Sequence, residues 1–189
     1  MKKIILASSS PRRKKLLQKL GLKFIVVESK VEETFDEKSD STSQIKKLSL
    51  AKAQAVAGKF SGSLIIAADT IIVFENRIIG KPKDNRDAIN ILKKLSGKSH
   101  QVVTAFTILD TDSKKFISKA AKTKIYFKAL TDKEIEDYIE TGEAWDKAGA
   151  YAIQEGLSQK FVKKIKGDYD NVVGLPLSLL KKELKKFGL

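Results

Sequence analysis

The feature that most constrains the fold is an apolar run from Leu64 to Phe74, which reads LIIAADTIIVF. A long run rich in β-branched side chains predicts a central strand, or a pair of strands, of a buried sheet. Asp69 and Thr70 interrupt it. A carboxylate in such a run must be paired, bind a metal or face a cleft, because an uncompensated buried charge is costly. A turn-forming Asp is the alternative, but no Gly, Pro or Asn flanks it. The pattern therefore favours a functional Asp69.

Residues 4–17 predict a short strand, a turn of three serines and a helix. Ser10 suits the N-cap position and Pro11 the first helical position. Arg12, Arg13 and two lysines then crowd the first turn, where the helix dipole is already positive. A bound phosphate chain would compensate these charges, since free N–H groups, serine hydroxyls and two arginines can cradle it. A solvated basic helix start is the alternative, and this segment alone does not decide between them.

The use of arginine supports the phosphate interpretation. Of 37 Lys and Arg residues only four are arginine, and two of these are adjacent at positions 12 and 13. A guanidinium grips phosphate oxygens in pairs, which an ammonium cannot do. The net charge of +14 also raises nucleic-acid binding, but the lysines are spread between 23 acidic residues and no zinc spacing or recognition motif is present. Nucleic-acid binding therefore ranks below enzymatic activity.

The chain of 189 residues predicts a single domain over residues 1–189, or one domain with a cleft between two lobes. There is no cysteine, which fits a reducing compartment. The start MKKIILA imitates a signal peptide, but its apolar run is too short, and no run approaches transmembrane length. We therefore expect a soluble, cytoplasmic protein that does not enter a membrane.

Strands and helices alternate irregularly along the chain, with a hairpin at Glu75–Arg77, which favours an α/β fold with a mixed sheet. Residues 167–176 are expected to form a loop, and His100, the single histidine, to be a polar loop residue and not a ligand. Besides the segments above, strands are expected near 24–27, 78–79, 102–109, 116–117, 125–127 and 161–165, and helices near 41–59, 84–95, 131–141 and 177–184.

Two lysines stand out by their positions. Lys52 lies on the apolar stripe of the helix near 41–59, four residues after Leu48. An inward-facing lysine must meet an anion, or else its stem must let the ammonium reach solvent at the edge of the stripe. Spacing alone leaves both open. Lys81 precedes Pro82, which predicts a stiff, exposed turn.

Six stretches in this order and spacing closely resemble the Maf family of nucleotide pyrophosphatases over essentially the whole chain. They are Ser8–Arg13, Lys52-Ala53, Ala68-Asp69-Thr70, Gly80-Lys81-Pro82, Lys147–Gln154 and Gly167–Pro176. The resemblance implies a three-layer α/β fold with an elongated mixed sheet and a central cleft between two lobes, of the Maf and Ham type similar to inosine triphosphatases. It also implies a homodimer and hydrolysis of a nucleoside triphosphate at the α–β phosphate bond, assisted by a divalent cation, Mg²⁺ or Mn²⁺.

The resemblance assigns roles to nine residues, each of the expected type. Asp69 is the family's proton acceptor. The implied catalytic residues are Asp69, Glu33, Lys52 and Lys81, with Asp69 and Glu33 also holding the metal, and the implied substrate-binding residues are Ser8, Arg12, Arg13, Thr70 and Gln154. If Asp69 is structural, we expect Asp69→Asn to lower stability, with activity falling only with folding. If it is the proton acceptor or metal ligand, we expect the variant to fold normally, or even to be more stable, because a poorly compensated buried charge is gone.

The family has two branches that differ at three of these positions. Arg12, Thr70 and Gln154 are similar to the branch acting on dTTP and UTP, including modified pyrimidine nucleotides, whereas Trp, Gln and Phe mark the branch acting on 7-methyl-GTP. Glu155 is an additional residue that would move the loop beside the base. The alternatives to a dTTP and UTP pyrophosphatase are a preference for 7-methyl-GTP, or a basic nucleic-acid-binding or cell-division (septum) protein without catalysis.

Overall fold

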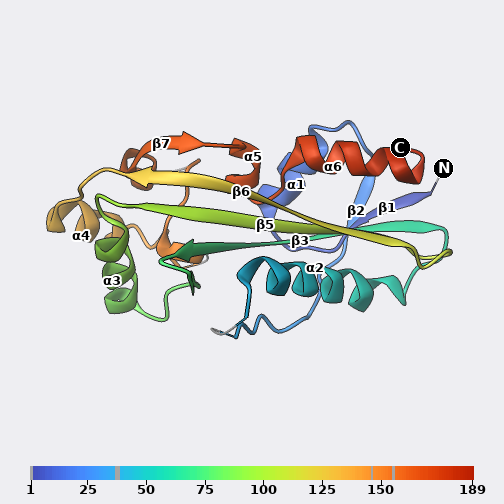
Figure 1. The fold of residues 1–189 in the computed structure, drawn as a ribbon, viewed down its shortest axis with the longest axis horizontal. Coiled ribbons are helices and arrows are strands. Elements are labelled where there is room, and N and C mark those ends of the chain that lie inside the picture. Colours follow the sequence, from blue (N-terminus) through green and yellow to red (C-terminus); the bar gives the residue numbers. More distant parts are fainter. Residues whose placement is uncertain (1, 37–38, 146, 155) are drawn as a thin grey trace. The chain divides into compact units, whose positions relative to one another are not determined.

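The computed structural model describes residues 2–36, 39–145, 147–154 and 156–189. These residues form a seven-stranded sheet in the order β2-β1-β3-β5-β6-β7, with β4 paired to β3 (Figure 1). The strands are β1 (Lys3–Leu6), β2 (Phe24–Val26), β3 (Ser63–Phe74), β4 (Arg77–Ile79), β5 (Ser99–Asp110), β6 (Phe116–Phe127) and β7 (Val162–Lys166). The run around Asp69 is thus one continuous strand, β3, and not a pair.

The sheet is mixed, as the sequence predicts. β1 runs parallel to both of its neighbours, so that Ile5 lies opposite Ile25 and Ile65. β3 and β4 are antiparallel and joined by Glu75 and Asn76, both with positive φ, which suits a tight hairpin turn. β6 and β7 are also antiparallel.

The helices begin at recognisable caps. Ser10 caps α1 by accepting from Arg13 N, Asp40 caps α2 and Asp84 caps α3. The α-helices are α1 (Pro11–Gln18), α2 (Ser41–Ala57), α3 (Asn85–Leu95), α4 (Asp132–Glu140), α5 (Tyr169–Val173) and α6 (Leu177–Leu184), and the 3₁₀-helices are η1 (Ala148–Ala150), η2 (Leu157–Phe161) and η3 (Lys185–Phe187). In Figure 1, α1 and α6 cover one face of the sheet around β1, and α2 covers the other.

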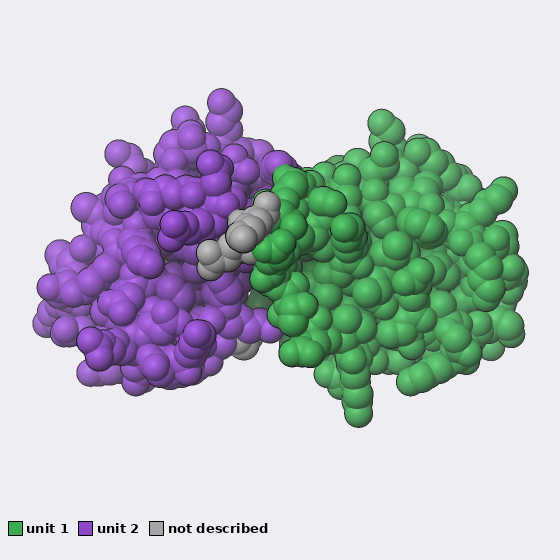
Figure 2. All heavy atoms as spheres, turned by 60° about the horizontal axis from the view of Figure 1, so that its bottom comes forward, with its two compact units in different colours: residues 1–70, 104–121, 174–189 green, residues 71–103, 122–173 purple. Residues whose placement is uncertain are grey.

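The chain divides into two compact units, coloured separately in Figure 2. Unit 1 comprises residues 1–70, 104–121 and 174–189, and unit 2 comprises residues 71–103 and 122–173. The three long strands, β3, β5 and β6, contribute residues to both units. Each unit has its own apolar core, with α2 packed on β1 and β3 in unit 1 and with α3 and α4 packed on β5 and β6 in unit 2.

Three expectations about secondary structure are wrong. The strands expected at 116–117 and 125–127 are one strand, β6, because its polar middle residues pair in the sheet despite their weak apolar pattern. The loop expected at 167–176 contains α5, whose start is supported by Asp168 Oδ1 accepting from Asp170 N. His100 is not in a loop but in β5, where it is 2% exposed and packs against aromatic rings.

Candidate functional site

Asp69 is the centre of the candidate site. It lies in the middle of β3, 6% exposed, beyond the point where β1 stops pairing with this strand at Leu6 and Ile66. The open space past the carboxyl end of a parallel strand is where α/β sheets commonly place their ligands. Here the chain leaves β1, passes through the three serines and starts α1. The fold therefore brings the phosphate-cradle segment of the sequence to Asp69.

Lys52 meets two carboxylates. It lies on the same stripe of α2 as Leu48 and Val56, which faces the sheet, and its side chain is only 8% exposed. Its ammonium bonds to Asp69 Oδ2 and, at 2.8 Å, to Glu33 Oε1. Of the two possibilities left open by the sequence, Lys52 therefore takes the one in which it faces inward and meets anions.

Arg13 donates hydrogen bonds to oxygens from three separate segments of unit 1. Its Nε donates to the carbonyl of Gly174 (2.9 Å), Nη1 to Ser8 Oγ (3.2 Å) and Nη2 to Thr70 Oγ1 (3.1 Å). Nη2 also lies 3.7 Å from Asp69 Oδ1. Burial lowers the pKa of Arg13, and the neighbouring Asp69 carboxylate opposes this. The guanidinium is thus fixed in a buried position beside Asp69.

The charges in this cluster balance. Arg13 and Lys52 supply two positive charges, and Asp69 and Glu33 supply two negative charges, within a few ångströms. Asp69 Oδ1 also accepts from the backbone N of Thr70 at 2.7 Å. Contacts thus link six of the nine predicted residues: Ser8, Arg13, Glu33, Lys52, Asp69 and Thr70. Arg12, the residue before Arg13, lies in the same turn of α1 and is half-buried.

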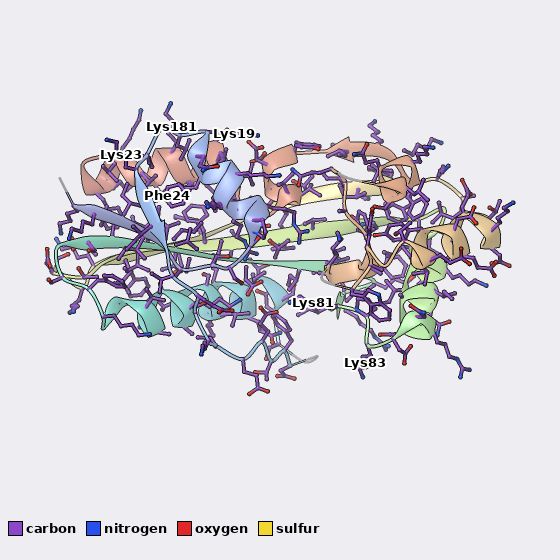
Figure 3. The ribbon with its side chains drawn as sticks, turned by 180° about the vertical axis from the view of Figure 1, so that it is seen from behind. Lys19, Lys23, Phe24, Lys81, Lys83 and Lys181 are labelled. Carbon is purple, nitrogen blue, oxygen red and sulfur yellow. The ribbon has the colours of Figure 1, made fainter. Side chains whose placement is uncertain are left out.

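Lys81 and Gln154 belong to unit 2. Lys81 is exposed between β4 and α3, as expected, and Figure 3 shows it with Lys83 in this connection. The preceding residue, Gly80, accepts a hydrogen bond from Gly149 N at 2.9 Å, which ties the turn to the segment leading to Gln154. Gly149 has a φ of 72°, and an added Cβ would lie 2.3 Å from Ile72 Cδ1.

The segment that carries Gln154 is held from both ends. Tyr151 OH lies 2.6 Å from His100 Nε2 in the buried part of unit 2. Ser158 Oγ accepts from Ala152 N (3.3 Å) and donates to Ala152 O (2.8 Å), which closes the loop after Gln154. Gln154 itself is half-buried. Glu155, the additional residue that we expected beside the base, lies outside the described residues.

Sequence reasoning missed two contributors to the Arg13 site. Thr104, in β5, is fully buried, and its Oγ1 lies 3.0 Å from Thr70 Oγ1. In the sequence it is one of two threonines in an apolar strand, and nothing distinguishes it from Thr107. Gly174 contributes a backbone carbonyl, and although its motif was recognised, no residue pattern indicates where a carbonyl points.

Two carboxylates, Glu33 and Asp69, are the candidate ligands for a divalent cation. Glu33 and Asp69 both approach the Lys52 ammonium, so they already converge on a positive charge. Within the described ranges, no three side chains of His, Cys, Asp or Glu gather as a metal cage. Mg²⁺ is commonly bound by one or two carboxylates together with substrate phosphates, so this pair fits such an ion.

Among the described helices, none combines the length and the apolar composition needed to cross a membrane.

The chain is similar to known proteins along nearly its whole length. The model of the Maf family, described as "Maf-like protein", matches residues 3–187. The dTTP/UTP pyrophosphatase of Thermoanaerobacter sp. (strain X514) is 51% identical over 185 residues, covering 97% of this chain and 96% of that protein. The dTTP/UTP pyrophosphatase of Geobacillus sp. (strain WCH70) is 46% identical over 188 residues, covering 100% of both chains.

The architecture also has a counterpart among solved structures. The Staphylococcus aureus Ham1 protein matches with a TM-score of 0.52 and 14% identity, covering 98% of this chain and 99% of that one. At this identity the likeness concerns the fold, and it confirms the expected Ham-type architecture. With a family model along nearly its whole length and relatives at about half identity, the chain belongs to the Maf family.

Proposed function

We propose that the protein is a nucleotide pyrophosphatase that hydrolyses dTTP and UTP to the monophosphate and pyrophosphate. The observation that carries this proposal is the cluster at the start of α1, in which the buried Asp69 and Lys52 meet Arg13 and the exposed Glu33. It combines acid–base groups with fixed cations at a helix N-terminus, where phosphate groups bind well. The names of the relatives, dTTP/UTP pyrophosphatases, support the same activity.

The cations bind and stabilise the triphosphate. Arg12, Arg13, Lys52 and Lys81 donate to phosphate oxygens and offset the negative charge that grows on the leaving pyrophosphate. Lys52 is suited to this task because an ammonium has three N–H donors. It can keep its bonds to Asp69 and Glu33 and still donate to a phosphate oxygen.

Asp69 acts as the proton acceptor. A water molecule attacks the α-phosphorus in line with the leaving pyrophosphate, and the Asp69 carboxylate takes its proton. The Thr70 backbone N–H and Lys52 orient this carboxylate through one hydrogen bond to each of its oxygens. Asp69 and Glu33 would also hold Mg²⁺ or Mn²⁺, which when bound neutralises phosphate charge.

The nucleotide preference follows from three positions. Arg12, Thr70 and Gln154 are the residue types of the dTTP and UTP branch, and modified pyrimidine nucleotides are expected to be accepted as well. Thr70 and Arg13 share a hydrogen bond, so the specificity position is in direct contact with the phosphate-binding cluster. A homodimer stays a prediction from the family resemblance, and a cytoplasmic location stays a prediction from the sequence.

A triphosphate panel with product identification tests the proposal. The protein is incubated with dTTP, UTP, dCTP, GTP and 7-methyl-GTP in the presence of Mg²⁺ or Mn²⁺, and pyrophosphate and orthophosphate are measured separately. We expect dTTP and UTP to give pyrophosphate at the highest rates. Release of orthophosphate, or no turnover with any triphosphate, would refute the activity, and fastest turnover of 7-methyl-GTP would assign the chain to the other branch.

A further inference from the structure

We propose that Thr104 is a positioning residue that holds the Arg13 guanidinium in its binding position through the hydroxyl of Thr70. The inference rests on the proposed function, because that function makes Arg13 a phosphate ligand. Thr104 itself is outside the nine predicted residues. Thr104 Oγ1 lies 3.0 Å from Thr70 Oγ1, and Thr70 Oγ1 lies 3.1 Å from Arg13 Nη2. A line of hydrogen bonds therefore runs from β5 through β3 to α1.

The direction of the bonds makes Thr104 matter. Arg13 is only a donor, so Thr70 Oγ1 must turn a lone pair toward Nη2. A threonine hydroxyl otherwise rotates freely about its Cβ–Oγ bond. Either hydroxyl can donate in the Thr70–Thr104 bond. When Thr70 donates, its hydrogen points at Thr104 and both of its lone pairs stay available to Arg13. Thr104 thereby keeps the accepting side of Thr70 toward Arg13.

The position of Thr104 lets it act as a rigid reference. It is 0% exposed in β5, the strand next to β3, and its branched side chain has few rotamers. Water therefore does not reach Thr104 itself, whereas Thr70 is half-buried. Without the Thr104 hydroxyl, the Thr70 O–H is free to turn its hydrogen toward the guanidinium, and a donor facing a donor repels. One of the three hydrogen bonds that hold Arg13, the bond to Thr70 Oγ1, would then be lost or weakened.

The expected effect is mainly on phosphate binding, with a smaller effect on the chemical step. Arg13 still has Ser8 and Gly174 as partners, so it loosens without leaving the site. A hydrogen bond to a charged group changes affinity by about tenfold or more, and a partial loss by about five- to tenfold. We expect Thr104→Val to raise KM for dTTP by about five- to tenfold. Turnover at saturation should fall by a smaller factor than KM rises, because Arg13 also offsets charge on the leaving pyrophosphate while Asp69 and Lys52 are untouched.

The strand offers a matched control. Thr107 is also in β5 and 0% exposed, and its Oγ1 contacts Ser49 Oγ (2.8 Å) and Ser118 Oγ (2.7 Å), away from Arg13. Thr107→Val therefore removes a buried hydroxyl of the same kind from the same strand. We expect it to lower the melting temperature and to leave KM unchanged. Thr104→Ser keeps the hydroxyl and should restore the KM of Thr104→Val to near the wild-type value.

The test compares wild type, Thr104→Val, Thr104→Ser and Thr107→Val by KM and kcat for dTTP and by calorimetric binding of inorganic pyrophosphate. Pyrophosphate probes the cation cluster without a base, so its Kd should rise in Thr104→Val by the same factor as KM. Should Thr104→Val not fold, Thr104→Cys, with a weaker hydrogen-bonding group, takes its place with an increase in the same direction. Equal KM and pyrophosphate Kd for the Thr104 and Thr107 variants, or failure of Thr104→Ser to restore binding, overturns the proposal. Absence of turnover in wild type refutes the proposed function only, since pyrophosphate binding still measures the role of Thr104.

Discussion

Replacing Asp69 with Asn removes a charge that the structure places between two cations. Asp69 Oδ2 bonds to Lys52 Nζ, and Arg13 Nη2 lies 3.7 Å from Oδ1. The variant leaves the buried Lys52 ammonium with Glu33, whose side chain is 38% exposed. From the sequence alone, a catalytic or metal-binding Asp69 predicts an Asp69→Asn protein that folds normally or is more stable. The contacts predict the opposite sign, because Asp69 is compensated and its removal uncovers a buried positive charge.

The magnitude follows from the burial of the pair. Removing one partner of a buried ion pair costs about 3–5 kcal/mol. Glu33 stays 2.8 Å from Lys52, and the Asn carbonyl still accepts a hydrogen bond. We therefore expect a loss of about 2–3 kcal/mol, below the range for a fully broken pair. For a chain of this length, 1 kcal/mol lowers the melting temperature by about 2–4 °C, so Tm should fall by about 5–10 °C.

The turnover of Asp69→Asn should fall much further than its lower stability can explain. Loss of a positioned acid–base group lowers turnover by about 10²–10⁴-fold. The assay is pyrophosphate release from dTTP, at a temperature where the thermal melt shows the variant fully folded. KM should change less than kcat, because the arginines and lysines still bind the phosphates.

Asp110→Asn is the matched control for this experiment. Asp110 is 9% exposed at the end of β5, and its carboxylate pairs with Lys2 and accepts from Ser113. Its removal should lower stability and leave turnover unchanged. An Asp69→Asn protein that melts like wild type and keeps most of its turnover would show that the chemistry has been assigned to the wrong residue. Equal loss of turnover in Asp110→Asn would show that the assay reports folding alone.

Two further predictions concern unit 2. Burial lowers the pKa of His100 from 6.5 to about 4. Between these values the unfolded chain binds more protons than the folded one, so the free energy of unfolding should fall by up to about 3 kcal/mol as the pH drops from about 6.5 to 4. Urea denaturation of wild type and His100→Gln measures this, and equal pH dependence in both would contradict it. Gly149→Ala should lower Tm more than Gly142→Ala, because both have a positive φ but only at Gly149 would a Cβ meet Ile72, at 2.3 Å; equal melting temperatures would refute the contact.

The sequence predicts strands with a continuous apolar pattern better than strands that contain polar positions. The apolar run around Asp69 predicts a buried strand or a pair of strands, and β3 is one continuous buried strand. The strand β6 was divided in two because its middle is rich in lysine, alanine and polar residues, and only pairing with its neighbours defines it. His100 was placed in a loop because a lone histidine carries no apolar pattern, yet it packs edge-on to Phe127 and Tyr151.

The site shows the same division between pattern and geometry. The helical stripe already places Lys52 on an inward face, but the sequence does not show which anion it meets. In the structure it meets Asp69, which lies in a strand 17 residues further along the chain. The resemblance names Asp69 and Glu33 together, whereas their convergence on one ammonium is visible only in the structure. Thr104 carries no signal in the sequence, because its neighbour Thr107 has the same residue type, strand and burial.

Hydrogen bonds within the protein, and not phosphate binding alone, require an arginine at position 13. The sequence explains an arginine there as a phosphate ligand, which uses the planar fork of the guanidinium. In the structure three of its N–H groups donate to oxygens of Ser8, Thr70 and Gly174, which lie 5, 57 and 161 positions away in the chain. A lysine has its three donors on a single nitrogen and cannot reach three such separated acceptors at once. The framework therefore requires arginine at position 13 even before a nucleotide binds, which accounts for its use in a chain that otherwise prefers lysine.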